Sequence, residues 1–161
     1  MENIVLEFKQ IENIYSEFSS TNNKILKKKF AQHLEEAIDE QDTNEDITLT
    51  IKCDENITKQ QKETATNTIK KYYGRKFKQS ENIIKKNRII ALSMFIIAVL
   101  LVICLHFLNE INTHYIITTI LEVVVWVFAW ESTDIIFFKN TKDKQDKKLY
   151  KQILSSKITF K

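Results

Sequence analysis

The segment that most constrains this chain is an apolar run of twenty residues, Ile89–Leu108, which reads IIALSMFIIAVLLVICLHFL. Its only polar side chains are those of Ser93 and His106. As a helix it would be roughly 30 Å long, which is the thickness of the hydrocarbon core of a bilayer. A buried helix of this length in a soluble protein usually carries a polar stripe. We therefore predict a transmembrane helix over residues 89–108.

A second apolar segment, residues 115–138, reads YIITTILEVVVWVFAWESTDIIFF and contains the acidic residues Glu122, Glu131 and Asp134. A carboxylate near the middle of a span costs about 2.5–3.5 kcal/mol on insertion scales. The thirteen Ile, Leu, Val and Phe residues outweigh that cost, so this segment is predicted to be a second transmembrane helix. The short polar link 109–114 predicts an extracytoplasmic turn, and the two spans would then form an antiparallel helical hairpin.

Basic residues flank the two predicted spans on the side away from this turn. Residues 58–88 carry ten Lys and Arg against two acidic residues, and residues 139–161 carry eight lysines against two aspartates. Residues 89–138 contain no Lys or Arg. Because basic flanks stay on the cytosolic side, the pattern predicts a multi-pass protein of the inner or plasma membrane of a cell, with both termini in the cytosol.

The polar parts of the chain are predicted to form a small α+β lobe in the cytosol. Residues 1–45 are predicted to be helical, because apolar residues recur at spacings of three and four, although the run Ile4–Phe8 also fits a strand. Residues 46–57 contain an alternating apolar and polar pattern over Ile47–Cys53, which predicts a strand. A lone strand is not stable, so this strand requires a partner.

The remaining cytosolic parts adjoin the membrane. Residues 58–88 are predicted to form a basic amphipathic helix that begins at a capping box, Thr58 with Gln61, and leads into the first span. Residues 139–161 are predicted to be a basic tail that ends in a strand, because Ile158–Phe160 alternates again. We expect this terminal strand to pair with the strand at Ile47–Cys53.

Several features follow one another in a fixed order over residues 46–161. These are an Ile-Thr-Leu-Thr-Ile strand, a basic helix with Ile69-Lys70-Lys71-Tyr72-Tyr73 and Arg75, an arginine before the first span, Glu122 with Trp126-Val127 and Trp130 in the second span, and the terminal Ile158-Thr159-Phe160. This order resembles a family of small uncharacterised bacterial two-span integral membrane proteins. The resemblance implies the two-span topology and implies no particular activity.

The composition excludes several kinds of catalytic site. Gly74 is the only glycine, whereas a P-loop, a dinucleotide-binding loop and a nucleophile elbow each need two or more. Cys53 and Cys104 are too few for a cysteine-based zinc site or a disulfide framework. No nucleophile and base can be paired from the pattern of residues. We therefore expect a protein that is not an enzyme and that has no catalytic residues, no cofactor and no metal.

Glu122 is the main candidate functional residue within the second predicted span. On a helical wheel it shares a face with Thr119, Trp126 and Ala129, and an intramembrane carboxylate is expected to face protein or water. One interpretation is that Glu122 and Thr119 join the hairpin or an oligomer by hydrogen bonds. The other is that Glu122 lines or gates a path for ions. Trp126 is expected to pack between helices, and Trp130 fits an interfacial aromatic belt.

Charged residues near the cytosolic ends of the spans form a second candidate group. Glu131 and Asp134 lie at the depth expected for Arg88 and Lys139, which predicts interfacial ion pairing. Basic residues beside a span attract anionic lipid headgroups, at about 1 kcal/mol for each charge. The residues predicted to contact headgroups are Lys85, Lys86, Lys142 and Lys144. No nucleic-acid partner is expected.

These patterns favour a non-enzymatic function at the membrane. The leading hypothesis is a membrane-anchored interaction or scaffolding module whose cytosolic lobe recognises an unidentified cytosolic protein. The alternative is a self-assembling pore or membrane-perturbing effector in which Glu122 lines or gates the path. A homo-oligomer is compatible with both hypotheses and is required by the second.

Overall fold

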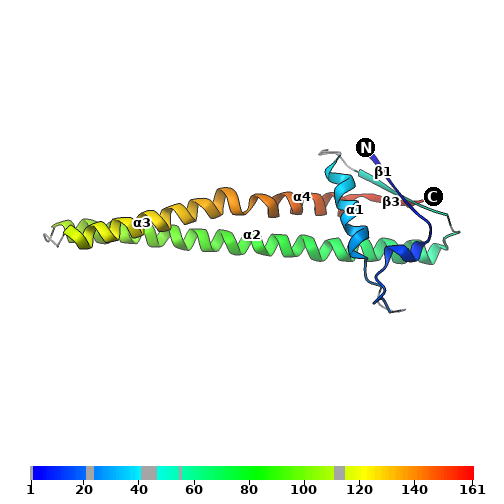
Figure 1. Ribbon diagram of the computed structural model, residues 1–161, viewed down its shortest axis with the longest axis horizontal. Helices are drawn as coiled ribbons and strands as arrows, with labels where there is room; N and C mark the ends of the chain where they lie inside the picture. The colour runs from blue at the N-terminus through cyan, green and yellow to red at the C-terminus, as the bar shows by residue number, and fades with distance from the viewer. Residues whose placement is uncertain (1, 21–23, 41–46, 55, 111–114) are drawn as a thin grey trace. The chain divides into compact units, whose positions relative to one another are not determined.

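The structure of the chain is a computed structural model that describes residues 2–20, 24–40, 47–54, 56–110 and 115–161 (Figure 1). The chain is mostly helical and forms two compact units. The first unit, which we call the lobe, comprises residues 1–79 and 146–161; the second, the helical unit, comprises residues 80–145. In chain order the elements are β1 (Glu2–Phe8), the 3₁₀ helix η1 (Ile11–Ile14), α1 (Lys28–Asp39), β2 (Ile47–Cys53), α2 (Lys59–Glu110), α3 (Tyr115–Asp134), the π-helix η2 (Ile135–Lys139), α4 (Thr141–Ser155) and β3 (Lys157–Phe160).

The lobe contains a three-stranded parallel sheet with the order β1-β2-β3. The register places Ile4 opposite Leu49 and Leu49 opposite Ile158. The predicted pairing of the terminal strand with Ile47–Cys53 is confirmed by this register. β2 is the central strand, and its apolar residues Leu49 and Ile51 are almost completely buried.

Helices cover one face of the sheet and form the core of the lobe with it. The buried side chains come from α1, from the first turns of α2 and from the last turns of α4, and they include Phe30, Leu34, Ile69, Tyr73, Tyr150 and Ile153. The opposite face of the sheet is polar. On that face Lys52 donates to Glu7 at 2.9 Å, and Val5 is 42% exposed.

The structure corrects the prediction that residues 1–45 are helical. Glu2–Phe8 is a strand, which is the alternative that the alternation allows, and among the described residues of this region the helices are η1 and α1. Ile4 and Phe8 are four residues apart, which suits a helix, but Ile4, Leu6 and Phe8 also alternate along a strand. Pairing with β2 decides between the two conformations, because the seven-residue register with Ile47–Cys53 buries Ile4 and pairs the facing backbone edges of the two strands.

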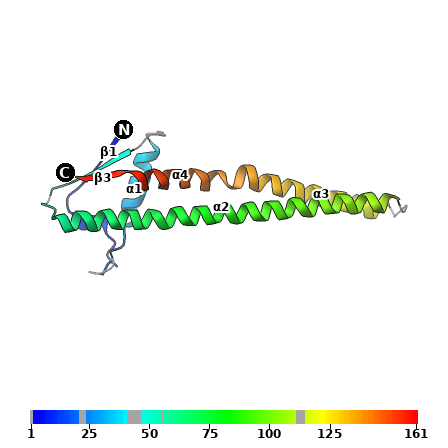
Figure 2. The same ribbon diagram turned by 180° about the vertical axis from the view of Figure 1, so that it is seen from behind.

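The helical unit consists of the second half of α2, α3, η2 and the start of α4. In both views α3 lies alongside this half of α2 (Figures 1 and 2). Three buried residues of α2 in this unit, Ala91, Ala98 and Leu105, recur every seven residues, which is the spacing of a helix–helix seam. On α3 the buried residues are Thr118 and Ser132, and the Ser132 hydroxyl donates to the Ala91 carbonyl at 2.9 Å.

Among the described residues, one helix is long and apolar enough to cross a membrane, and it is α2. Only 17% of its most apolar stretch is buried. α3 does not meet the same criterion; it carries three acidic residues and gives way to a π-helix after Asp134. The structure thus supports one spanning helix, and the second span over 115–138 stays a prediction. Of the predicted turn 109–114, residues 111–114 lie outside the described residues.

Candidate functional site

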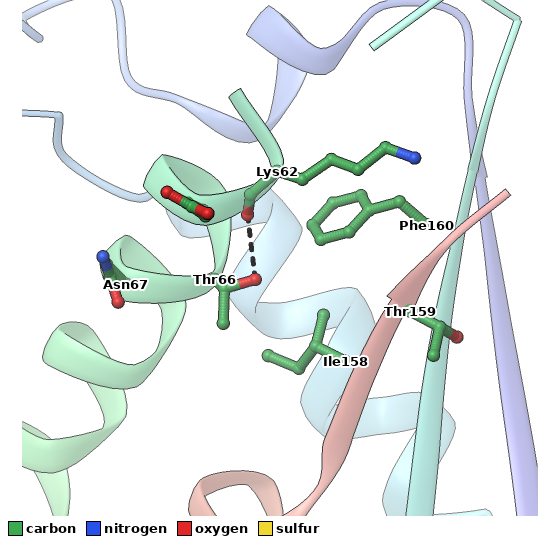
Figure 3. Close-up of a pocket in the computed structure, with 7 residues that line it drawn as sticks. Lys62, Thr66, Asn67, Ile158, Thr159 and Phe160 are labelled. Atoms are coloured by element: carbon green, nitrogen blue, oxygen red, sulfur yellow. Dashed lines mark hydrogen bonds between the residues drawn. The ribbon is translucent and has the colours of Figure 1, made fainter. Parts of the chain in front are cut away.

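A groove of about 480 Å³ lies in the lobe between the first turns of α2 and strand β3 (Figure 3). This volume is in the range of about 300–1,000 Å³ that is typical of ligand pockets. Sequence analysis did not find the groove, because its two walls come from distant parts of the chain and meet only in the folded lobe. The lining residues are Lys62, Glu63, Thr66, Asn67, Ile158, Thr159 and Phe160.

The helical wall of the groove is set by the start of α2. The Thr58 N–H donates to Gln61 Oε1 at 2.9 Å, and the Gln61 N–H donates to Thr58 Oγ1 at 3.3 Å. These reciprocal bonds form the capping box that the sequence predicts. Ala65 and Ile69 are completely buried and hold the helix against the core. The adjacent stripe, which includes Thr66, therefore faces the groove.

The strand wall of the groove is the outer strand of the sheet. Toward β2, the Lys161 N–H donates to the Ile51 carbonyl at 3.0 Å, and the Cys53 N–H donates to the Lys161 carbonyl at 3.1 Å. Because backbone groups of successive residues in a strand point to opposite edges, the N–H and C=O groups of Ile158 and Phe160 point away from β2. No strand within the described part of the chain pairs with this edge. A row of unpaired backbone groups is a template for another extended chain.

The strand wall of the groove contributes the apolar side chains of Ile158 and Phe160, and the helical wall contributes the polar and charged side chains. Figure 3 shows Lys62 extending over the Phe160 ring and Ile158 pointing toward Thr66. Thr159 points to the other face of the sheet, where its hydroxyl lies 3.1 Å from that of Thr50. The exposed Lys157 begins β3, and the exposed Lys161 follows its last residue. These groups can supply hydrogen bonds, apolar contacts and ionic contacts to a bound chain.

A second, smaller groove of about 210 Å³ lies between η1 and the start of α2. Its lining includes Tyr15, with the Lys24 ammonium group 5.1 Å from the centre of the ring. Burial, with a smaller contribution from Glu12, raises the pKa of Tyr15 above its usual value. Among the described residues, no group of three or more His, Cys, Asp and Glu side chains could hold a metal ion.

A cluster around Lys76 joins the three helices of the lobe, and sequence analysis did not detect it. Lys76 donates to Glu35 on α1 at 3.0 Å, and its ammonium group lies 5.4 Å and 5.2 Å from the ring centres of Tyr72 and Tyr150. Burial opposes the charge and lowers the pKa of Lys76, but the hydrogen bond and the charge of Glu35, with smaller contributions from Tyr150 and Tyr72, together outweigh it and raise the pKa. The cluster keeps Lys76 charged and ties α1, α2 and α4 together, which indicates a structural role.

The structure shows the surroundings of Glu122 within a single chain, while its predicted contact with protein or water in the membrane stays a prediction. Within the chain Glu122 does not face α2; it is exposed, as are Trp126 at 75% and Trp130 at 68%. Thr119 is half-buried, and its hydroxyl donates to the Tyr115 carbonyl at 2.9 Å. The contact with α2 uses a neighbouring stripe of α3, where the small polar side chains Thr118 and Ser132 are buried. α3 carries apolar residues on all of its sides, so a helical wheel alone does not predict which side packs against α2.

Some of the charged residues that were predicted to form ion pairs near the membrane interface lie together beside η2. Lys139 forms ion pairs with Glu131 and with Asp134, the latter at 3.6 Å. Arg88 is exposed and forms no ion pair with them in the described part of the chain. Nearby, Asn87 donates to buried Asn140 at 2.9 Å. The lysines predicted to contact lipid headgroups are all exposed: Lys85, which lies 4.0 Å from Glu81, and Lys86, Lys142 and Lys144.

Comparison of the chain with protein-family models, with curated proteins and with solved structures finds no match. The resemblance to small bacterial two-span membrane proteins therefore stays a prediction. What can be said of function comes from the groove, the exposed apolar surface and the chemistry of the residues in them.

Proposed function

We propose that the protein is a membrane-anchored interaction module. The observation that carries this proposal is that α2 is one uninterrupted helix of 52 residues whose first part packs into the core of the lobe and whose last part is apolar and exposed. A helix of this kind couples a folded polar domain directly to a membrane anchor. In this proposal α3 is a second span, and both termini are in the cytosol.

The exposed apolar surface of the helical unit supports the anchor. Large apolar patches on a soluble monomer rarely exceed a few hundred Å², and larger ones mark protein or membrane contacts. Here the exposed apolar side chains continue along both helices, and they include Ile89, Leu92, Leu100 and Phe107 on α2, and Ile116, Val123 and Val127 on α3. The basic residues that flank this surface favour the orientation with the lobe in the cytosol.

The topology predicts a clear pattern of chemical labelling. In a background without Cys53 and Cys104, Asn112→Cys should react with a membrane-impermeant maleimide added to intact cells. Ser155→Cys, which replaces an exposed residue of the lobe, should react only after the cells are opened. Labelling of position 155 in intact cells would reverse the orientation, and recovery of the chain in the supernatant after alkaline carbonate extraction would refute the anchor.

The edge of β3 supports the second half of the proposal, which is that the lobe binds an extended segment of a cytosolic protein. An added strand would pair with the free N–H and C=O groups of Ile158 and Phe160, as in other cases of strand addition to a sheet edge. Lys62, Lys157 and Lys161 outnumber the single acidic residue Glu63 around this edge. The groove should therefore prefer an acidic segment.

This preference can be tested with a displayed library of short peptides and the full chain in lipid nanodiscs. Selected peptides should be acidic, and Thr66→Arg should abolish their binding because the larger side chain fills the groove next to Phe160. Thr64→Arg is the matched control: it changes the same residue type on the same helix, but Thr64 lines the second groove instead. Equal binding by both variants would exclude the β3 groove as the binding site.

The alternative of a self-assembling pore is favoured by a single observation, the outward position of Glu122 on α3. Because Glu122 lies outside the contact between α2 and α3, a polar path could form only between copies of the chain. A pore therefore requires assembly through the exposed face of α3, and this face can be tested by itself.

A further inference from the structure

The exposed face of α3 carries polar groups that the chain itself does not satisfy. Glu122 makes no hydrogen bond or ion pair with any described residue, and it lies one helical turn from Trp126 and two turns from Trp130. The indole N–H groups of these residues are hydrogen-bond donors that also have no partner in the described chain. We call the stripe of Tyr115, Thr119, Glu122, Trp126 and Trp130 the Glu122 face.

The chain does not cover this face, because α3 meets α2 through a neighbouring stripe of residues. That stripe contains Thr118, one helical turn before Glu122, and Ser132; they are 7% and 1% exposed, and the Ser132 hydroxyl donates to the Ala91 carbonyl. Turning Glu122 toward α2 would break this bond and would bring bulky tryptophans against Ala91 and Ala98. A partner for Glu122 must therefore come from outside the chain.

We propose, building on the proposed membrane insertion, that a second copy of this chain packs against the Glu122 face. Seven residues separate Glu122 from Tyr115, so the carboxyl group would lie about 10 Å inside the span. Exposure of a carboxyl group to lipid near the middle of a span costs about 2.5–3.5 kcal/mol. A protein surface with donors and acceptors removes this cost, whereas lipid chains supply neither.

A second copy fits this face because the face is self-complementary. Two copies with the same topology hold Glu122 at the same depth, so a two-fold axis along the membrane normal brings the two carboxyl groups together. Each can then exchange hydrogen bonds with the other or with an indole N–H of the partner. Such an isologous contact is the commonest symmetry of homo-oligomers.

The aromatic residues of the face provide enough area for a dimer. Tyr115, Trp126 and Trp130 are 81%, 75% and 68% exposed. Aromatic side chains bury about 150–250 Å² each, so these rings alone could bury roughly 1,000 Å² over two copies. Stable interfaces bury about 1,200–2,000 Å² in total, and the neighbouring Val123, which is 58% exposed, would add to the contact.

Disulfide crosslinking in membranes tests which face is used. In a background without Cys53 and Cys104, Thr119→Cys should form a crosslinked dimer rapidly. Ile120→Cys is the control, because Ile120 is 59% exposed but lies on a different side of α3. Equal crosslinking at positions 119 and 120 would indicate random collision and would overturn the proposal, as would faster crosslinking at position 120.

The contribution of the Glu122 carboxyl group to the dimer is tested by measuring the mass of the complex and its dissociation constant in nanodiscs or mild detergent. The unmodified chain should have the mass of a dimer, and a monomer or a larger oligomer would overturn the two-fold contact. Glu122→Leu should raise the dimer dissociation constant about fivefold, the effect of about 1 kcal/mol for one interhelical hydrogen bond. Glu122→Gln retains hydrogen-bonding groups and should leave the constant within about twofold of the original value.

Carbonate extraction of the same membranes separates this proposal from the one on which it is built. If the chain is extracted, membrane insertion fails and the contact fails with it. If the chain stays in the membrane but is monomeric, the anchor stands and only the contact through the Glu122 face is refuted.

Discussion

Removal of residues 151–161 should destabilise the lobe by at least about 3 kcal/mol, since each fully buried apolar side chain contributes about 1.5–3 kcal/mol. The truncation deletes Ile153, which is 1% exposed, and the half-buried Ile158 and Phe160. It also deletes the strand that pairs with one side of β2, so the central strand becomes an edge. The helical unit, which ends at Gln145, should keep its structure.

Hydrogen–deuterium exchange of the full and truncated chains in nanodiscs would measure this effect. Amides of β2 should lose protection, beginning with the Cys53 N–H, whose acceptor is the Lys161 carbonyl. Exchange in α3 should not change. Lys157→Ala is the control, because it alters an exposed side chain of the same strand and retains all backbone bonds. Unchanged protection of β2 after truncation would mean that β3 contributes little to the lobe.

The parts of the fold that depend on local signals could be predicted from the sequence. The alternation over Ile47–Cys53 predicts β2 because a half-buried strand needs one apolar face. Thr58 and Gln61 predict the start of α2 because their side chains and backbone groups satisfy one another. The absence of proline after this point allows α2 to continue to Glu110.

The parts that depend on tertiary contacts could not be predicted in this way. Residues Ile4–Phe8 fit two periods equally well, and only the parallel register with β2 selects the strand. Apolar residues lie on every side of α3, so the side that meets α2 is decided by the close approach of Ala91 and Ser132. The groove combines a helix wall with a strand from the other end of the chain, and no local pattern in either wall signals it.

The role of Lys76 also depends on tertiary contacts and could not be predicted from the local sequence. In the sequence, Lys76 is one of many lysines on a basic helix, and the simplest interpretation of such a residue is a solvated or headgroup-binding charge. In the structure its ammonium group is shared among Glu35, Tyr72 and Tyr150, which come from three different helices. Its role follows from the approach of α1 and α4 to α2, which the sequence does not specify locally.

Tyr73→Ala should have the largest effect of any single substitution in the lobe, a loss of about 3–5 kcal/mol of unfolding free energy. Tyr73 is the largest completely buried side chain among the described residues, and it packs against Tyr72 and Tyr150 at ring distances of 5.1 and 5.7 Å. Alanine is a good helix former, so the loss would come from the cavity and not from α2 itself. The missing ring would also loosen α1, to which the Tyr73 hydroxyl is bonded.

Tyr73→Phe separates the hydroxyl from the ring. The hydroxyl donates to the Ala31 carbonyl at 3.1 Å, and burial, followed by the nearby charge of Glu35, raises the pKa of Tyr73 well above its usual value, so the proton stays in place. Its removal should cost about 1 kcal/mol, the net value of one buried hydrogen bond.

Hydrogen exchange of the β2 amides measures both substitutions. Tryptophan fluorescence would not serve, because Trp126 and Trp130 both lie in α3 and report on the helical unit alone. Tyr115→Ala, which removes an exposed ring from the helical unit, should leave these amides unchanged. A Tyr73→Ala variant with β2 protection equal to that of Tyr73→Phe would show that the ring does not hold the lobe together.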